Sequence, residues 1–302
     1  MRSKTENTVT DNIPMFSISK EMFLETLKNK QLSGETIRGY SVDLNQFQKF
    51  LIKDNNAPVF MESITTEAIE AYVKMLRKRK LTPTSINRKI NSISYFCKFA
   101  IKKCWLSFNP ADDVDRIRAT RKERTFLKLE EIQAIVAKIP QVTIKYVVIL
   151  MSNTGLRINE AINLRLQDVD FENKILHVIQ GKGGKNRDVP LNDELIKHLT
   201  FYKDRHRSRT KSLNFFVTKS GGISQQYVNQ ELKKAAKAAG IEKDVTSHVL
   251  RHSFASQLVQ TDTHVAIISK LLGHADVRTT SIYMHADQED LQQAVNTIKF
   301  LN

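Results

Sequence analysis

The sequence predicts a mainly α protein with one small β insertion, organised as two domains. Three observations predict this class. The 302 residues are long for one domain and comfortable for two. Apolar residues recur every three or four positions through most of the chain, which is the period of amphipathic helices. Two short alternating segments, 175–179 and 187–191, flank Gly181-Lys182-Gly183-Gly184, which is typical of a β-hairpin with a glycine-rich turn.

Four helical patterns follow a polar arm at residues 1–15 and fill residues 16–107. Ser19 is the candidate N-cap of the first, with Met22, Phe23 and Leu27 facing inward. The second has apolar residues at alternating three- and four-residue steps between 37 and 51. The third spans 69–76 and ends in a basic run, and the fourth has an apolar face from 86 to 100. This pattern predicts a small helical domain.

The apolar period stops between residues 108 and 124. Asn109-Pro110 breaks a helix, and residues 111–124 are charge-rich with no expected buried face, so we expect an interdomain linker here. Residues 125–302 form the larger domain. Around the hairpin we expect helices at 129–139, 144–153, 157–166, 193–203, 224–239, 247–259, 264–272, 276–284 and 288–299.

Both halves of the chain are basic. The net charge is +15, with 20 basic and 13 acidic residues in 1–120, and 27 and 19 in 121–302. Double-stranded DNA would therefore meet a favourable field on both domains. The two cysteines form no CxxC pair, residues 1–14 lack the apolar core of a signal peptide, and the longest apolar run is 146–151. We expect a cytoplasmic, nucleoid-associated protein with no membrane partner.

Three short motifs hold the residue types that cleave a phosphodiester. They are Thr-Gly-Leu-Arg at 154–157, His-Val-Leu-Arg-His at 248–252, and Leu-Leu-Gly-His-Ala at 271–275, which is followed by Tyr283. Arginine offers two parallel donors to phosphate oxygens, histidine moves a proton, and tyrosine can attack phosphorus. Because a phenol has a pKa of about 10, Tyr283 needs a base or a strong positive potential nearby. Arg157, Arg251 and the histidines can supply both.

Metal and nucleotide sites fit these motifs poorly. His248 and His252 have the spacing of zinc-binding helices, but Arg251 lies between them and its fixed charge disfavours a cation. The Gly-Lys-Gly-Gly-Lys run at 181–185 lacks the spacing of a phosphate-binding loop and has strand patterns on both sides. No carboxylate cluster suggests a two-metal nuclease. We therefore expect neither a metal nor a cofactor.

As a set, the motifs resemble the tyrosine recombinase (phage integrase) family, and within it the Xer-like and transposon-encoded recombinases, over nearly the whole chain. The resemblance implies that Arg157 and Arg251 clamp the scissile phosphate, with Glu160 in a supporting acidic position. His248 and His274 assist at the phosphate, and Lys182 in the hairpin turn protonates the leaving 5′-oxygen. Tyr283 is then the nucleophile, which forms a 3′-phosphotyrosyl intermediate.

The resemblance also implies the fold and the partners. A helical, SAM-like core-binding domain at 16–107 and a mixed α/β catalytic domain at 125–302 would clamp a double-stranded recombination site. The segment 287–302 would be a helix passed to a neighbouring protomer, giving a tetramer on two DNA sites. The expected function is site-specific recombination, in integration, excision or resolution. Candidate DNA contacts are the basic residues Arg77, Lys78, Arg79, Lys80, Arg88, Lys89, Lys185 and Arg187.

Two other functions remain as alternatives. A type IB topoisomerase uses similar residues on one duplex without strand exchange, and the compact helical N-terminal domain and short C-terminal helix favour a recombinase over it. A non-catalytic architectural DNA-binding protein is the second alternative. The complete residue set argues against it, because binding alone needs no tyrosine beside a proton donor.

Overall fold

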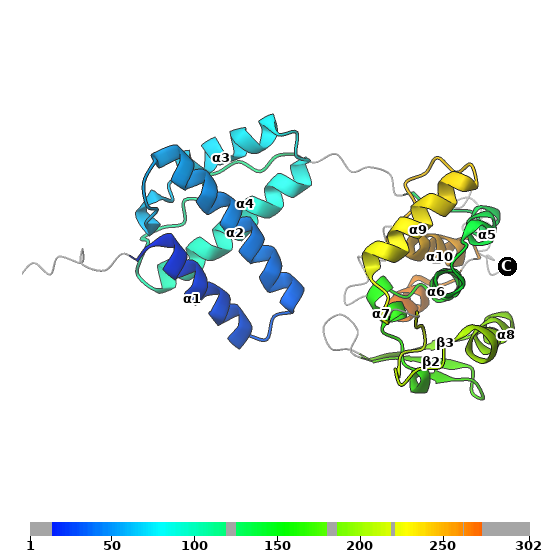
Figure 1. Cartoon of the computed structure of the whole chain (residues 1–302). Helices are drawn as coiled ribbons and strands as arrows, with labels where there is room; N and C mark the ends of the chain where they lie inside the picture. Colours follow the sequence, from blue (N-terminus) through cyan, green and yellow to red (C-terminus); the bar gives the residue numbers. More distant parts are fainter. Residues whose placement is uncertain (1–13, 119–124, 180–185, 219–220, 262, 274–302) are drawn as a thin grey trace, which may run out of the picture. The chain divides into compact units, whose positions relative to one another are not determined.

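The chain divides into two compact units, residues 1–122 and 123–302. A computed structural model describes residues 14–118, 125–179, 186–218, 221–261 and 263–273. Within these ranges most residues are helical and one three-stranded antiparallel sheet occurs, which confirms the predicted class (Figure 1). None of the helices in these ranges is long and apolar enough to cross a membrane.

The described part of the first unit, residues 14–118, contains four helices, α1 (Phe16–Asn29), α2 (Gly34–Asn55), α3 (Thr66–Lys78) and α4 (Pro83–Lys102), and a 3-10 turn at Met61–Ser63. Three of the helices begin at a hydroxyl side chain, as helix N-termini favour. Ser33, Thr65 and Thr82 each accept a hydrogen bond from the backbone N–H three residues later. Proline follows Thr82 in the first turn of α4, where its missing N–H costs nothing.

The start of α1 differs from the prediction. The helix begins at Phe16, and Ser19 is not its N-cap but lies buried in the first turn, where its Oγ donates to the Met15 carbonyl at 3.0 Å. Fully buried Phe16 explains the earlier start, because its ring packs edge-on against Phe96 with centroids 5.1 Å apart. Met22 is 39% exposed, so its predicted inward position was wrong.

Residues 109–117 pack onto the first unit, so the expectation that residues 111–124 have no buried face was wrong for this part. Ala111 and Val114 are buried in the unit's core, and the Asn87 side chain exchanges two hydrogen bonds with the backbone of Ile117, at 2.8 and 3.0 Å. Ala111 and Val114 are isolated apolar residues without a helical period, so the sequence pattern could not predict their burial. The linker at 108–124 and the other domain bounds remain predictions.

The second unit is built around α6 (Val142–Thr154), which is buried on nearly all sides, as expected of a helix with apolar residues all round. It packs against α10 (Ser247–Gln260) and α8 (Asp193–Phe201), while α5 (Leu129–Lys138) packs against α9 (Gln225–Ala238). The short helix α7 (Ile158–Ile162) packs against α6, and α11 (Val265–Leu272) packs against α10. The predicted helices at 276–284 and 288–299 lie outside the described residues.

The sheet contains β1 (Val169–Asp170), β2 (Ile175–Val178) and β3 (Arg187–Pro190), in that order. Strands β2 and β3 pair antiparallel with Val178 opposite Arg187, which confirms the predicted hairpin arms. Its turn, 180–185, lies outside the described residues. The sequence pattern missed the two-residue β1. It also overextended α7, since the chain leaves the helix after Ile162 and forms a 3-10 turn at Leu166–Asp168.

Candidate active site

The site begins at the turn between α6 and α7. Gly155 ends α6 in the left-handed conformation, with φ +63°, and its N–H donates to the Met151 carbonyl at 3.0 Å. A Cβ at this position would collide with the Phe254 ring and lie 2.8 Å from Leu272 Cδ2. The turn therefore requires glycine for both its conformation and its close packing. It places Arg157 at the N-terminus of α7.

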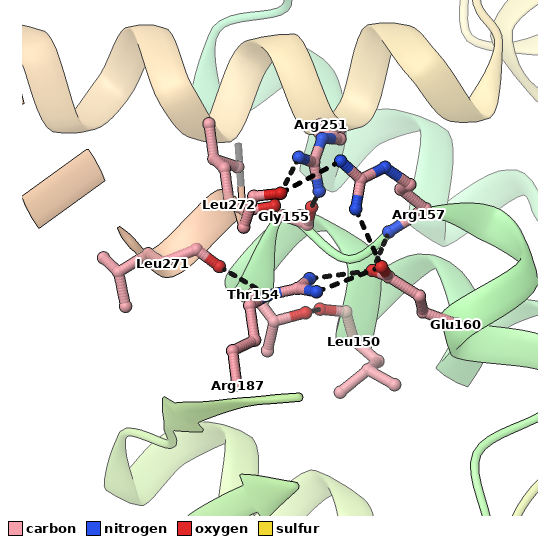
Figure 2. Close-up of polar contacts among 10 residues, drawn as sticks. Leu150, Thr154, Gly155, Arg157, Glu160, Arg187, Arg251, Leu271 and Leu272 are labelled. Atoms are coloured by element: carbon pink, nitrogen blue, oxygen red, sulfur yellow. Dashed lines mark hydrogen bonds and ion pairs between the residues drawn. The ribbon is translucent and has the colours of Figure 1, made fainter. Parts of the chain in front are cut away.

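Glu160 lies one turn into α7 and joins two arginines. Its Oε2 accepts from the Arg157 backbone N–H at 2.8 Å, and its Oε1 accepts from Arg157 Nη1 at 2.9 Å. Arg187, at the start of β3, donates from Nη1 to Oε1 at 3.0 Å and from Nη2 to Oε2 at 2.7 Å (Figure 2). The Glu160 and Arg187 side chains are only 8% and 9% exposed, so this pair is shielded from solvent.

The two arginines hold Glu160 ionised. Burial by itself would raise the pKa of its carboxyl group, but the hydrogen bonds and positive charges of Arg187 and then Arg157 outweigh burial and lower that pKa from 4.5 to about 2. The Arg157 side chain, at 24% exposed, is the more open of the two cations. On one side of Glu160, Arg187 therefore forms a buried ion pair with it. On the other side, the Arg157 guanidinium remains accessible to solvent.

Helix α10 contributes His248 and Arg251. Arg251 is 5% exposed, and it donates from Nη1 to the Gly155 carbonyl at 2.6 Å and from Nη2 to the Leu272 carbonyl at 2.6 Å. His248 lies three residues earlier, which puts it on the same side of the helix, and it is exposed. His252 is half-buried.

The C-terminal end of α11 is where the arginines meet. Three successive carbonyls accept from three different arginines: Leu271 from Arg187 Nε at 2.9 Å, Leu272 from Arg251 Nη2 at 2.6 Å, and Gly273 from Arg157 Nη2 at 3.3 Å (Figure 2). The last carbonyls of a helix lack partners within it and carry negative partial charge, so they attract cations. The chain then continues directly into His274.

The structure therefore brings Arg157, Glu160 and Arg251 together, with His248 on the same helix as Arg251. Lys182, Lys185, His274 and Tyr283 lie outside the described residues. Within the described ranges, no three His, Cys, Asp or Glu side chains lie close enough to share a metal ion.

Two of the basic residues predicted to contact DNA are not at the surface. Lys89 is buried, and its ammonium donates to Asp43 Oδ1 at 2.9 Å. Arg187 is held by Glu160 and Leu271. Arg88 also pairs with Asp43, but its side chain is 56% exposed, and residues 77–80 at the C-terminal end of α3 are all exposed.

Sequence reasoning missed the role of Arg187. A usable signal was present, because alternate residues of a strand face the same side. Arg187 shares its side of β3 with fully buried Val189, whereas Asp188 is exposed. The two-residue period of the strand therefore puts Arg187 on the buried side of β3, where its charge requires a carboxylate partner.

Comparisons with known proteins agree with the predicted family and the fold. The model of the "Phage integrase family" matches residues 125–290, and the "Phage integrase, N-terminal SAM-like domain" matches residues 21–103. The tyrosine recombinase XerD of Rickettsia bellii is 31% identical, over 90% of this chain and 95% of its own. A tyrosine recombinase of Thermosipho africanus is 32% identical, over 89% and 95%.

A solved structure of the Tn1549 transposon integrase, in complex with a circular intermediate DNA, shares the fold. Its TM-score is 0.74, at 17% identity, with 93% of this chain and 98% of that chain covered. None of the relatives named here supports a topoisomerase or an architectural protein. The chain therefore belongs to the phage integrase family of tyrosine recombinases, enzymes that break and rejoin DNA strands in site-specific recombination.

Proposed function

We propose that this recombinase cuts each strand of its DNA site by attack of the Tyr283 phenolate oxygen on the scissile phosphorus. The new bond is a 3′-phosphotyrosyl ester, and the bond from phosphorus to the 5′-oxygen breaks, which leaves a free 5′-hydroxyl. Because one phosphate ester replaces another, rejoining by the 5′-hydroxyl of a partner strand requires no nucleotide.

The observation that carries this proposal is the convergence of Arg157 and Arg251 on adjacent carbonyls of one turn, Leu272 and Gly273. Charge accumulates on both nonbridging oxygens of the phosphate in the transition state, so two cationic donors are needed at one place. Donors already held by backbone carbonyls and by Glu160 need little rearrangement when the phosphate arrives.

The remaining roles are assigned by chain position. His248, exposed one turn before Arg251, accepts the proton of Tyr283 or holds the phosphate. His274 follows Gly273 directly and donates to a phosphate oxygen. Lys182, in the turn between β2 and β3, gives its proton to the leaving 5′-oxygen. No metal or cofactor takes part in this scheme.

The proposed partner is a double-stranded recombination site, bound by both units. The exposed basic residues at 77–80 and Arg88 would contact phosphates, which fixes the protein on DNA without reading its sequence. The transposon integrase described above was solved with DNA bound, which supports this partner. Residues 287–302 would join protomers head to tail into a tetramer on two sites.

The test uses a DNA site nicked so that cleavage traps the covalent adduct. Tyr283→Phe should bind the site with nearly unchanged affinity and form no adduct on a denaturing gel, whereas the unmodified protein should form the adduct in the presence of EDTA. Adduct formation by Tyr283→Phe, or cleavage that depends on added magnesium, would refute the proposal.

A further inference from the structure

We propose that Arg187 is a positioning residue, which acts through Glu160 to hold the Arg157 guanidinium where the scissile phosphate binds. This inference rests on the proposed role of Arg157 in the phosphate clamp. Arg187 itself makes no contact with the phosphate in this scheme.

The geometry makes Glu160 a bridge with one arginine on each side. Both carboxylate oxygens accept from Arg187, and both also accept from Arg157, one from its guanidinium and one from its backbone N–H. A carboxylate held at both oxygens by a planar, two-pronged donor has one orientation. The direction of the Arg157 side chain is therefore set by a residue that lies 30 positions later and on a different element.

Arg187 is also anchored independently of Glu160. Its Nε donates to the Leu271 carbonyl, and its side chain passes so close to Gly273 that a Cβ there would lie 2.9 Å from Arg187 Cδ. Gly273 has φ +63°, which glycine adopts without strain. The three nitrogens of one guanidinium thus connect the hairpin base, α7 and the end of α11. The three N–H donors of a lysine ammonium all lie on one nitrogen, so lysine cannot make the same set of bonds.

Arg187 also acts on Glu160 through its charge. Among the described residues, the charged groups that face Glu160 are Arg157, from the start of its own helix, and Arg187, from β3, while the end of α11 presents backbone carbonyls to the arginines. Burial opposes ionisation of Glu160, and Arg187 is the largest opposing influence. Without Arg187, the pKa of Glu160 would rise toward the range where enzymes are assayed. Protonation would then remove the charge that attracts Arg157.

The experiment compares single-turnover cleavage of the nicked DNA site with half-site binding, between pH 5 and pH 8. The main variant is Arg187→Gln, which removes the charge, and Arg187→Lys is the conservative variant. Arg207→Gln is the matched control. Arg207 lies in the same unit, and its guanidinium also donates to backbone carbonyls, those of Ser212, Asn214 and Phe215, but not to Glu160.

Arg187→Gln should bind the half-site within about twofold of the unmodified protein and cleave on the order of 100-fold more slowly, because a misplaced clamp acts on the transition state. Its cleavage rate should also fall more steeply than that of the unmodified protein as the pH decreases, an additional acid limb caused by protonation of Glu160. Arg187→Lys should recover part of the rate. Glu160→Gln should cleave slowly without the limb, because it has no carboxyl group to titrate at this position.

Three results would overturn the inference. The first is cleavage by Arg187→Gln as fast as by Arg207→Gln. The second is a loss of rate that does not change with pH. The third is full recovery on a substrate with a 5′-bridging sulfur, which would place the defect in protonation of the leaving group.

If Arg187→Gln does not fold, Arg187→Lys must show the reduced cleavage rate and the additional acid limb. Normal cleavage by Arg157→Lys would refute the phosphate clamp itself, a separate outcome.

Discussion

Arg251 donates from Nη1 to the backbone oxygen of Gly155 at 2.6 Å, across 96 positions of the chain. This bond directly connects the Thr-Gly-Leu-Arg motif to the His-Val-Leu-Arg-His motif. The glycine supplies a carbonyl that the left-handed turn aims at α10, and the buried arginine supplies the charge. The same packing that orients Arg251 also leaves no room for a side chain at residue 155.

Gly155→Ala should therefore destabilise the protein by about 2–4 kcal/mol, because left-handed strain is added to overpacking against Phe254 and Leu272. Gly240→Ala is the matched control, since Gly240 has φ +72° but nothing within 4 Å of its would-be Cβ. It should cost only the conformational part, about 1 kcal/mol. Urea unfolding followed by circular dichroism measures both, and equal losses would contradict the packing argument.

Glu160 should make stability depend on pH. Its folded pKa, about 2, is below its ordinary value of 4.5, so its contribution is complete above pH 4.5 and is lost as the pH falls toward 2. Glu160→Gln should lower the free energy of unfolding on the order of 3 kcal/mol at pH 7. The difference from the unmodified protein should shrink between pH 4.5 and pH 3. A difference that stays constant over this range would contradict the assignment.

Asp43 should be a stability residue of the first unit. Its carboxylate is fully buried and accepts from Arg88, Lys89 and Ser92. Asp43→Asn leaves the buried Lys89 ammonium without its counter-charge and should cost about 3–5 kcal/mol. The control is Asp244→Asn, whose partner Lys233 is exposed, and it should change stability by less than about 1 kcal/mol. Fluorescence of Trp105, which packs on Phe99 in this unit, follows unfolding of the first unit, and circular dichroism follows the control, because Asp244 lies in the second unit.

Lys182 should act on the leaving group. Lys182→Ala should cleave ordinary DNA slowly and recover on a substrate with a 5′-bridging sulfur, because a thiolate leaves without a proton. Lys185→Ala, altered in the same turn, is the comparison, and any defect that it has as a DNA contact should be equal on the two substrates. Equal defects of Lys182→Ala on the two substrates would move the role to another residue.

Residues 287–302 should couple protomers. The sequence predicts a helix with Leu291, Val295 and Ile298 on one face, and a short helix needs a partner surface for such a face. Deleting the segment should leave monomer binding to a half-site, weaken cooperative filling of a full site, and abolish recombination. Gel-shift titrations with unchanged cooperativity would show that the segment packs on its own domain.

The sequence by itself determined the two-domain, mainly helical class, the hairpin arms at β2 and β3, and the family. These follow from local periods of two and 3.6 residues and from motif chemistry, which are properties of short windows. The same periods placed Leu27 and Leu51 in the core, where the structure has them.

Only the tertiary structure decided which charged residues face solvent and which are held inside. Lys89 and Arg187 look like surface cations in the sequence, yet Asp43 and Glu160 hold them, 46 and 27 positions away. Likewise Phe16 rather than Ser19 set the start of α1, because burial of an aromatic ring outweighs a capping preference. A pairing between distant residues depends on how helices and strands pack, and no local period encodes it.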